Sequence, residues 1–107
     1  MSVISPEEAG KRETKVLHEK VKKSFSIRLW EDRTRGSRWV PLFDGSALRL
    51  ISDEYQRTID IRVADTGMRT FEFLPLAPGS HEIVLEFRYG WKFTSERRLF
   101  YSIEVSP

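Results

Sequence analysis

The chain has 107 residues, of which 18 are Lys or Arg and 16 are Asp or Glu, so its formal net charge is +2. A chain of this length fits one compact domain and buries roughly two-thirds of its unfolded surface, which suffices for a core. It contains no Cys, which excludes disulfides, thiolate metal sites and cysteine nucleophiles. The nearly balanced charge argues against bulk electrostatic binding of nucleic acid, although it leaves room for a local basic patch.

The first 13 residues, MSVISPEEAGKRE, predict a flexible arm, because they are polar, contain Pro6 and Gly10 and show no hydrophobic period. The arm has no apolar run of signal-peptide length, and nowhere does the chain have about 18 consecutive apolar residues. As written, the sequence predicts a cytoplasmic protein without a membrane segment, and it leaves open the export of a processed form. We expect residues 14–107 to form a single domain.

Alternation of apolar and polar residues, which is typical of half-buried strands, dominates the rest of the chain. Such runs occur at 25–30, 48–50, 59–63, 81–89 and 99–105. The segment HEKVKKS (18–24) fits either a short helix or an edge strand. Turn residues separate the runs, as FDGS at 43–46, DTG at 65–67, APGS at 77–80 and YGW at 89–91. The pattern predicts an all-β fold, an immunoglobulin-like antiparallel β-sandwich of about seven to eight strands.

Catalytic and metal sites find little support in the sequence. His18 and His81 are isolated, and no His/Asp/Glu cluster has metal-ligand spacing. No G-x-S-x-G motif, Walker-type loop or dinucleotide fingerprint occurs. His81 follows the APGS turn, where a solvated or hydrogen-bonded histidine at a strand start is the simpler interpretation. We therefore expect no enzymatic activity, no cofactor and no metal ion.

Three connections of the predicted sandwich can share one end, because they alternate with turns at the opposite end. They span 31–38, 64–68 and 89–94. The third places three aromatic residues within five positions around Gly90, which favours an interface. The alternative is that Trp91 or Phe93 folds back onto the edge of the sandwich. Trp39 is predicted to lie in the core and Gly36 to adopt a positive φ.

These loops resemble those of the chagasin-type inhibitors of papain-like cysteine peptidases. The match extends over most of residues 25–105 and is clearest in IRLWEDRTRGSRW and APGSHEIVLEFRYGW. The family's first loop reads Asn-Pro-Thr-Thr-Gly-aromatic, followed by Trp; the corresponding residues here are Asp32, Arg33, Thr34, Arg35, Gly36 and Ser37, followed by Trp39. Its second loop, Gly-x-Gly-Gly, aligns with Ala64, Asp65, Thr66 and Gly67, and its third, Arg-Pro-Trp, aligns with Tyr89, Gly90 and Trp91.

The resemblance implies an inhibitor that fills the cleft of a papain-like cysteine peptidase with three loops and is not cleaved. We expect the protein to be a monomer. Thr34 would enter near the catalytic cysteine, the second loop would lie along the cleft through its backbone, and Trp91 would pack on an aromatic surface. The implied peptidase-binding residues are Asp32, Arg33, Thr34, Arg35, Gly36, Asp65, Thr66, Gly67, Tyr89, Gly90 and Trp91.

The departures from the family motifs carry their own expectations. Replacing the motif proline by Arg33, and two glycines by Ala64 and Thr66, is expected to loosen or reshape the loops. Arg33 and Arg35 would also bring two cations to a catalytic site whose histidine is itself positively charged. An acidic target would suit such a loop.

Two other functions fit the same residues. One is a non-inhibitory recognition domain that binds an acidic protein or a polyanion through a basic and aromatic loop end. Its candidate residues are Arg33, Arg35, Arg38, Lys92, Arg97 and Arg98, interleaved with Tyr89 and Trp91. The other is a structural module whose loops have no binding role.

Overall fold

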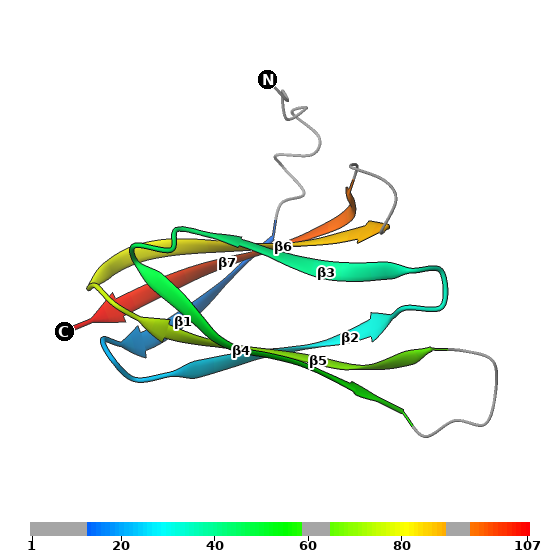
Figure 1. Ribbon diagram of the computed structural model, residues 1–107. Coiled ribbons are helices and arrows are strands. Elements are labelled where there is room, and N and C mark those ends of the chain that lie inside the picture. Colours follow the sequence, from blue (N-terminus) through cyan, green and yellow to red (C-terminus); the bar gives the residue numbers. More distant parts are fainter. Residues whose placement is uncertain (1–12, 59–64, 90–94) are drawn as a thin grey trace, which may run out of the picture.

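The computed structural model describes residues 13–58, 65–89 and 95–107, and in these ranges it contains seven strands in two sheets (Figure 1). The strands are β1 (Thr14–Lys20), β2 (Phe25–Asp32), β3 (Ser37–Phe43), β4 (Leu48–Arg57), β5 (Thr66–Pro75), β6 (Gly79–Tyr89) and β7 (Ser95–Ser106). One sheet has the order β1-β7-β6-β3 and the other the order β2-β5-β4. The predicted all-β sandwich is confirmed. Within the described ranges no helix is long and apolar enough to cross a membrane.

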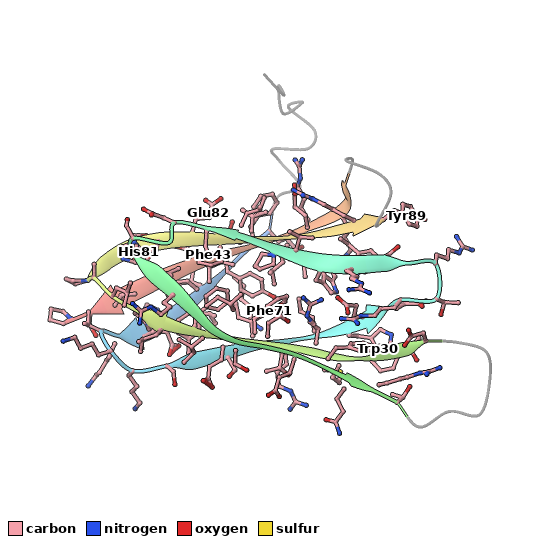
Figure 2. All side chains as sticks on the ribbon, viewed as in Figure 1. Trp30, Phe43, Phe71, His81, Glu82 and Tyr89 are labelled. Atoms are coloured by element: carbon pink, nitrogen blue, oxygen red, sulfur yellow. The ribbon has the colours of Figure 1, made fainter. Side chains whose placement is uncertain are left out.

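The core lies between the two sheets and is made by the inward-facing residue of each alternating pair. Phe71 and Phe43 project into this space in Figure 2, and the ring of Phe43 meets that of Phe73 edge-on at 5.1 Å between centroids. Trp39 is 4% exposed, and its ring lies 4.9 Å from that of Phe87. The prediction that Trp39 belongs to the core is therefore confirmed.

The N-terminal strand β1 settles the ambiguity of HEKVKKS. It is an edge strand that pairs in parallel with β7, and Leu17 packs against the core. The strand ends at Lys20, and Lys22 turns the chain with a φ of 63°. Within β1, half-buried Leu17 and Glu19 alternate with exposed residues, which is the two-residue period of a strand and not the period of a helix. Residues 1–12 of the predicted arm lie outside the described residues.

The DTG turn predicted at 65–67 is wrong, because Thr66 and Gly67 open β5, the central strand of the three-stranded sheet. Gly67 pairs with Glu31 on one side and with Arg57 on the other. A Cβ at Gly67 would lie 2.2 Å from the carbonyl oxygen of Gln56. The glycine allows the close approach of two strands rather than a turn. The strand predicted at 59–63 lies outside the described residues.

The loops gather at one end of the sandwich. On the right of Figure 1 lie the β2–β3 connection, the end of β4 with the start of β5, and the end of β6 with the start of β7. The β1–β2, β3–β4 and β5–β6 turns lie at the opposite end. We call the first of these ends the loop end; strand alternation places three separate chain segments there, as the sequence predicted.

We expect Gly67→Ala to lower the free energy of unfolding by about 1–3 kcal/mol, the usual cost of overpacking. The added methyl group would meet the backbone of β4, which cannot move aside as a flexible side chain can. Gly45→Ala is the matched control, because a Cβ at Gly45 meets nothing within 4 Å. Urea denaturation followed by tryptophan fluorescence measures both variants, and equal stabilities would contradict the close approach at Gly67.

Candidate functional site

The first loop is a tight turn between β2 and β3. The N–H of Gly36 donates to the carbonyl oxygen of Arg33 at 2.8 Å, and Gly36 has a φ of 78°, as predicted. The N–H of Thr34 donates to the carboxylate of Asp32 at 2.9 Å. Hydrogen bonds from the side chain and then the backbone of Thr34 hold the pKa of Asp32 below its usual value. Thr34 and Arg35 form the exposed tip of the turn.

The first loop is hydrogen-bonded to Asp65, the residue just before β5. The N–H of Arg33 donates to the carbonyl oxygen of Asp65 at 2.7 Å, and the N–H of Asp65 donates to the Thr34 hydroxyl at 3.0 Å. The hydroxyl of Tyr55 donates to the Asp65 carboxylate at 2.8 Å. Burial and this hydrogen bond raise the pKa of Tyr55 to about 12, so the phenol keeps its proton and remains a donor. The first loop, Tyr55 and Asp65, which are distant in sequence, therefore form one unit.

A buried carboxylate, that of Glu31, lies beneath this unit. Glu31 is fully buried, and it continues the inward-facing series of β2 after Leu29. It accepts hydrogen bonds from the backbone N–H of Trp39 at 2.7 Å and from Arg69 Nη1 at 2.7 Å. Arg69 in turn donates to both carboxylate oxygens of Asp53, at 2.5 and 2.8 Å. The network joins β2, β3, β5 and β4 at the loop end.

Arg33 completes the network and is not a free cation. Its Nε donates to Glu31 at 2.5 Å, and its guanidinium lies 3.6 Å from the centre of the Tyr55 ring. The Arg33 side chain is only 18% exposed. The expectation that Arg33 and Arg35 both present charge at the loop end is therefore wrong for Arg33, because its charge is compensated inside the protein. Arg35 remains exposed.

A second buried glutamate lies at the base of the third loop. Glu86, on the outer face of the four-stranded sheet, is 5% exposed. It accepts hydrogen bonds from Arg88 Nε at 2.8 Å and from Arg98 Nε at 2.7 Å. Arg88 belongs to β6 and Arg98 to β7, so the glutamate joins the two strands that carry the third loop.

Residues 19–105 match the sequence model of the chagasin family peptidase inhibitor I42. The chain belongs to the chagasin family. The family consists of peptidase inhibitors and not of enzymes. Comparison with curated protein sequences gave no match.

Three solved structures share the chagasin-family fold with this chain. The cysteine protease inhibitor EhICP2 from Entamoeba histolytica has a TM-score of 0.70 at 18% identity, over 87% of this chain and 96% of its own. The solution structure of Amebosin has a TM-score of 0.60 at 19% identity, over 85% and 88%. PbICP-C, solved in complex with falcipain-2, has a TM-score of 0.59 at 12% identity, over 99% and 96%.

The residues that align with the family motifs fall into three groups. Asp32, Arg33, Thr34, Arg35 and Gly36 form the first loop, and Asp65 is bonded to it. Thr66 and Gly67 belong to β5, and Gly67 is buried against the backbone of β4, so it offers little surface to a partner.

The third group aligns with the family's third loop. Tyr89 is the last residue of β6 and lies at the loop end in Figure 2. Gly90 and Trp91 lie outside the described residues.

The sequence reasoning missed the residues that support the loops from below: Glu31, Asp53, Tyr55 and Arg69. One signal was available for Glu31, since a carboxylate stands where the β2 alternation calls for an apolar residue, and a buried carboxylate requires donors. His81 behaves as predicted, with its Nε2 hydrogen-bonded to the Ala77 carbonyl at 2.9 Å. Across the ranges that the structure describes, no three His, Cys, Asp or Glu residues form a group that could hold a metal ion.

We expect Glu31→Gln to lower the free energy of unfolding by about 3–5 kcal/mol, because it removes the counter-charge that Arg33 and Arg69 share in a buried site. Guanidinium denaturation measures the loss. Glu54→Gln is the matched control, since Glu54 is exposed on β4 and its loss should change stability by less than about 0.5 kcal/mol. A similar small effect for Glu31→Gln would show that the buried charge does not hold the loop end.

A pH dependence follows from Glu86. Burial acts to raise the pKa of Glu86, but the hydrogen bonds from Arg88 and Arg98 outweigh burial and hold the pKa below its ordinary value of 4.5. A carboxylate with a lowered pKa contributes stability that is present above the unfolded-state value and is lost as pH falls through the folded-state value. We therefore expect Glu86→Gln to destabilise the protein at pH 7 and to differ progressively less from wild type below pH 4.5.

Thermal unfolding of wild type, Glu86→Gln and the control Glu54→Gln between pH 7 and pH 3 measures this dependence. A difference between wild type and Glu86→Gln that stays constant across this range would contradict a titrating Glu86 carboxylate. Glu54→Gln separates the effect of Glu86 from the general response of the domain to acid.

Proposed function

We propose that the protein is a competitive, tight-binding inhibitor of papain-like cysteine peptidases that occupies the active-site cleft with its loop end. Membership of the chagasin family supports this function. A structural relative, PbICP-C, is bound to falcipain-2. The observation that carries the proposal is the pair of hydrogen bonds between the first loop and Asp65. They hold the first loop to Asp65 before any partner arrives, which spares the entropy of ordering these residues on binding.

The closed turn explains how such a loop could occupy a cleft without being cut. A peptidase cleaves a segment whose scissile carbonyl is held in line with the nucleophile. Here the Arg33 carbonyl is already bonded to Gly36, and the Thr34 hydroxyl accepts the N–H of Asp65. Opening the turn would break both bonds. The first loop therefore presents a folded tip, Thr34 and Arg35, rather than an extended substrate.

The charge at the tip of the first loop affects which peptidases the protein can inhibit. With Arg33 compensated by Glu31, the exposed cation of the first loop is that of Arg35. One cation near the positively charged histidine of a papain-like site costs less than the two expected from the motif, and an acidic residue in the cleft would offset it. Peptidases with an acidic cleft wall are therefore the best candidates in an inhibition panel.

The alternative function, a recognition domain for an acidic protein or polyanion, loses part of its basis. Arg33 is paired with Glu31 and Arg98 with Glu86, so two of its six proposed cations are compensated within the protein. Arg35, Arg38 and Arg97 remain exposed. Binding to a polyanion through them would fall steeply with salt.

We expect the wild-type protein to inhibit members of a panel of papain-like peptidases competitively and to stay intact during prolonged incubation with them. Trp91→Ala should raise the inhibition constant about 30-fold, which corresponds to the roughly 2 kcal/mol of a tryptophan anchor. The unfolding midpoint should change little. Enzyme kinetics with a fluorogenic substrate, and mass spectrometry of the inhibitor, measure these outcomes.

Leu42→Ala is the matched control for Trp91→Ala. Leu42 is 41% exposed on the outer face of β3, next to the last residue of that strand and so toward the opposite end of the sandwich. It should leave inhibition unchanged. Absence of inhibition by folded wild-type protein at micromolar concentration across the panel would contradict the proposed function.

A further inference from the structure

One large apolar side chain outside the three loops is exposed beside the loop end. Trp30 is 54% exposed and points outward from β2, on the outer face of the three-stranded sheet. In Figure 2 it lies toward the end of the sandwich where β2 runs into the first loop. Exposing half of an indole to water is unfavourable, and tryptophan is among the residues most enriched at binding hot spots.

Trp30 and its neighbour Met68 form a short apolar patch on the outer face of the sheet, which ends at the polar Gln56. Trp30 is opposite Met68 in β5, and Met68 is opposite Gln56 in β4. The next row toward the loops contains Asp32 and Thr66, about 7 Å away at the rise of two strand residues.

The row on the other side of Trp30 is polar. It contains Arg28, Thr70 and Glu54, which are opposite one another in the same way. The apolar surface on this part of the outer face is thus that of Trp30 and Met68, in the row nearer to the first loop.

The backbone beneath Trp30 is held firmly. Trp30 lies inside the β2–β5 ladder, and its carbonyl oxygen accepts a hydrogen bond from Trp39 Nε1 at 2.9 Å. Trp39 is a core residue whose own N–H binds the buried Glu31. A side chain carried on a fixed strand loses only its rotamer freedom when it is covered, so ordering the backbone would cost no further free energy.

We propose that Trp30 is a fourth peptidase contact, which packs on an apolar surface at the rim of the cleft while the loops occupy the cleft itself. The inference rests on the proposed function. Continuity determines the partner, because any protein that receives Thr34 and Arg35 must have surface beside them. Trp30 lies on β2, and Thr34 follows two residues after that strand ends at Asp32. The polar row of Arg28, Thr70 and Glu54 marks where the proposed apolar contact ends.

The test compares two exposed apolar residues of the same sheet. Trp30→Ala is expected to raise the inhibition constant at least tenfold, mainly through faster dissociation, with an unchanged unfolding midpoint. Ile51→Ala is the matched control, because Ile51 is 44% exposed on β4 at the bulge, away from the loop end, and should change the inhibition constant less than twofold. Trp30→Thr keeps a residue that favours strands and provides a second variant if Trp30→Ala folds poorly.

Oxidative footprinting of the wild-type complex gives an independent readout, since Trp30 should be protected by bound peptidase and Ile51 should not. Failure of wild type to inhibit any papain-like peptidase would reject the proposed function. If wild type inhibits, and the inhibition constants of Trp30→Thr and Trp30→Ala lie within twofold of the wild-type value, the Trp30 contact alone would be rejected. Sedimentation that shows a dimer dissociated by the Trp30 variants would instead assign this row to self-association and overturn the inference.

Discussion

The buried carboxylate of Glu31 is the interaction on which the loop end depends. An uncompensated charge at this depth would cost several kcal/mol, so the site exists only because three donors converge on it. These donors are the backbone N–H of Trp39 and the side chains of Arg33 and Arg69. Throughout the described part of the chain every buried side-chain nitrogen and oxygen has a hydrogen-bond partner. Such a network adds little net stability compared with an apolar core, but it allows one arrangement of its members. Here its members are the strands that carry the first two loops.

The molecule separates three tasks along its length. Apolar side chains between the sheets hold the sandwich together, with Phe71, Phe73 and Ile103 fully buried. Toward the loops the stabilising groups become charged, with Glu31 beneath the first two loops and Glu86 beneath the third. At the tips, Thr34 and Arg35 are exposed. Residues at the tip can therefore change with the target while the supports below remain, which is how rigid scaffolds with variable loops generally acquire new partners.

Strand alternation was enough to predict the sandwich, the core position of Trp39 and the shared end of the three connections, because period and turn chemistry are local properties. The start of β5 was missed for a physical reason. A glycine after Asp-Thr indicates a turn when read alone, whereas Gly67 serves the close approach of β4, a neighbour that only the sheet reveals. The role of Arg33 was wrong for a similar reason, since a sequence shows that a residue is charged but not where its side chain points.

The supports of the site were harder still to predict. Glu31 and Arg69 are 38 positions apart, and Asp53 and Arg69 are 16 positions apart. No spacing rule connects such residues, because their meeting is a product of strand order in the three-stranded sheet. The sequence shows only that Glu31 occupies an inward-facing position of β2. A buried carboxylate there requires hydrogen-bond donors, but the sequence does not identify which residues supply them.

Arg33 also shows that a loop can be restrained in two physically different ways. A proline, which the family motif carries at this position, fixes φ within the residue itself and needs no neighbours. Arg33 restrains the same loop through Glu31, the face of Tyr55 and the carbonyl of Asp65. The second kind of restraint is tertiary: it forms only when the strands of the three-stranded sheet are in register, and it links the first loop to Asp65, which a proline would not do. Loss of the motif proline therefore does not by itself imply a loose loop, because the shape of the tip has become a property of the folded end as a whole.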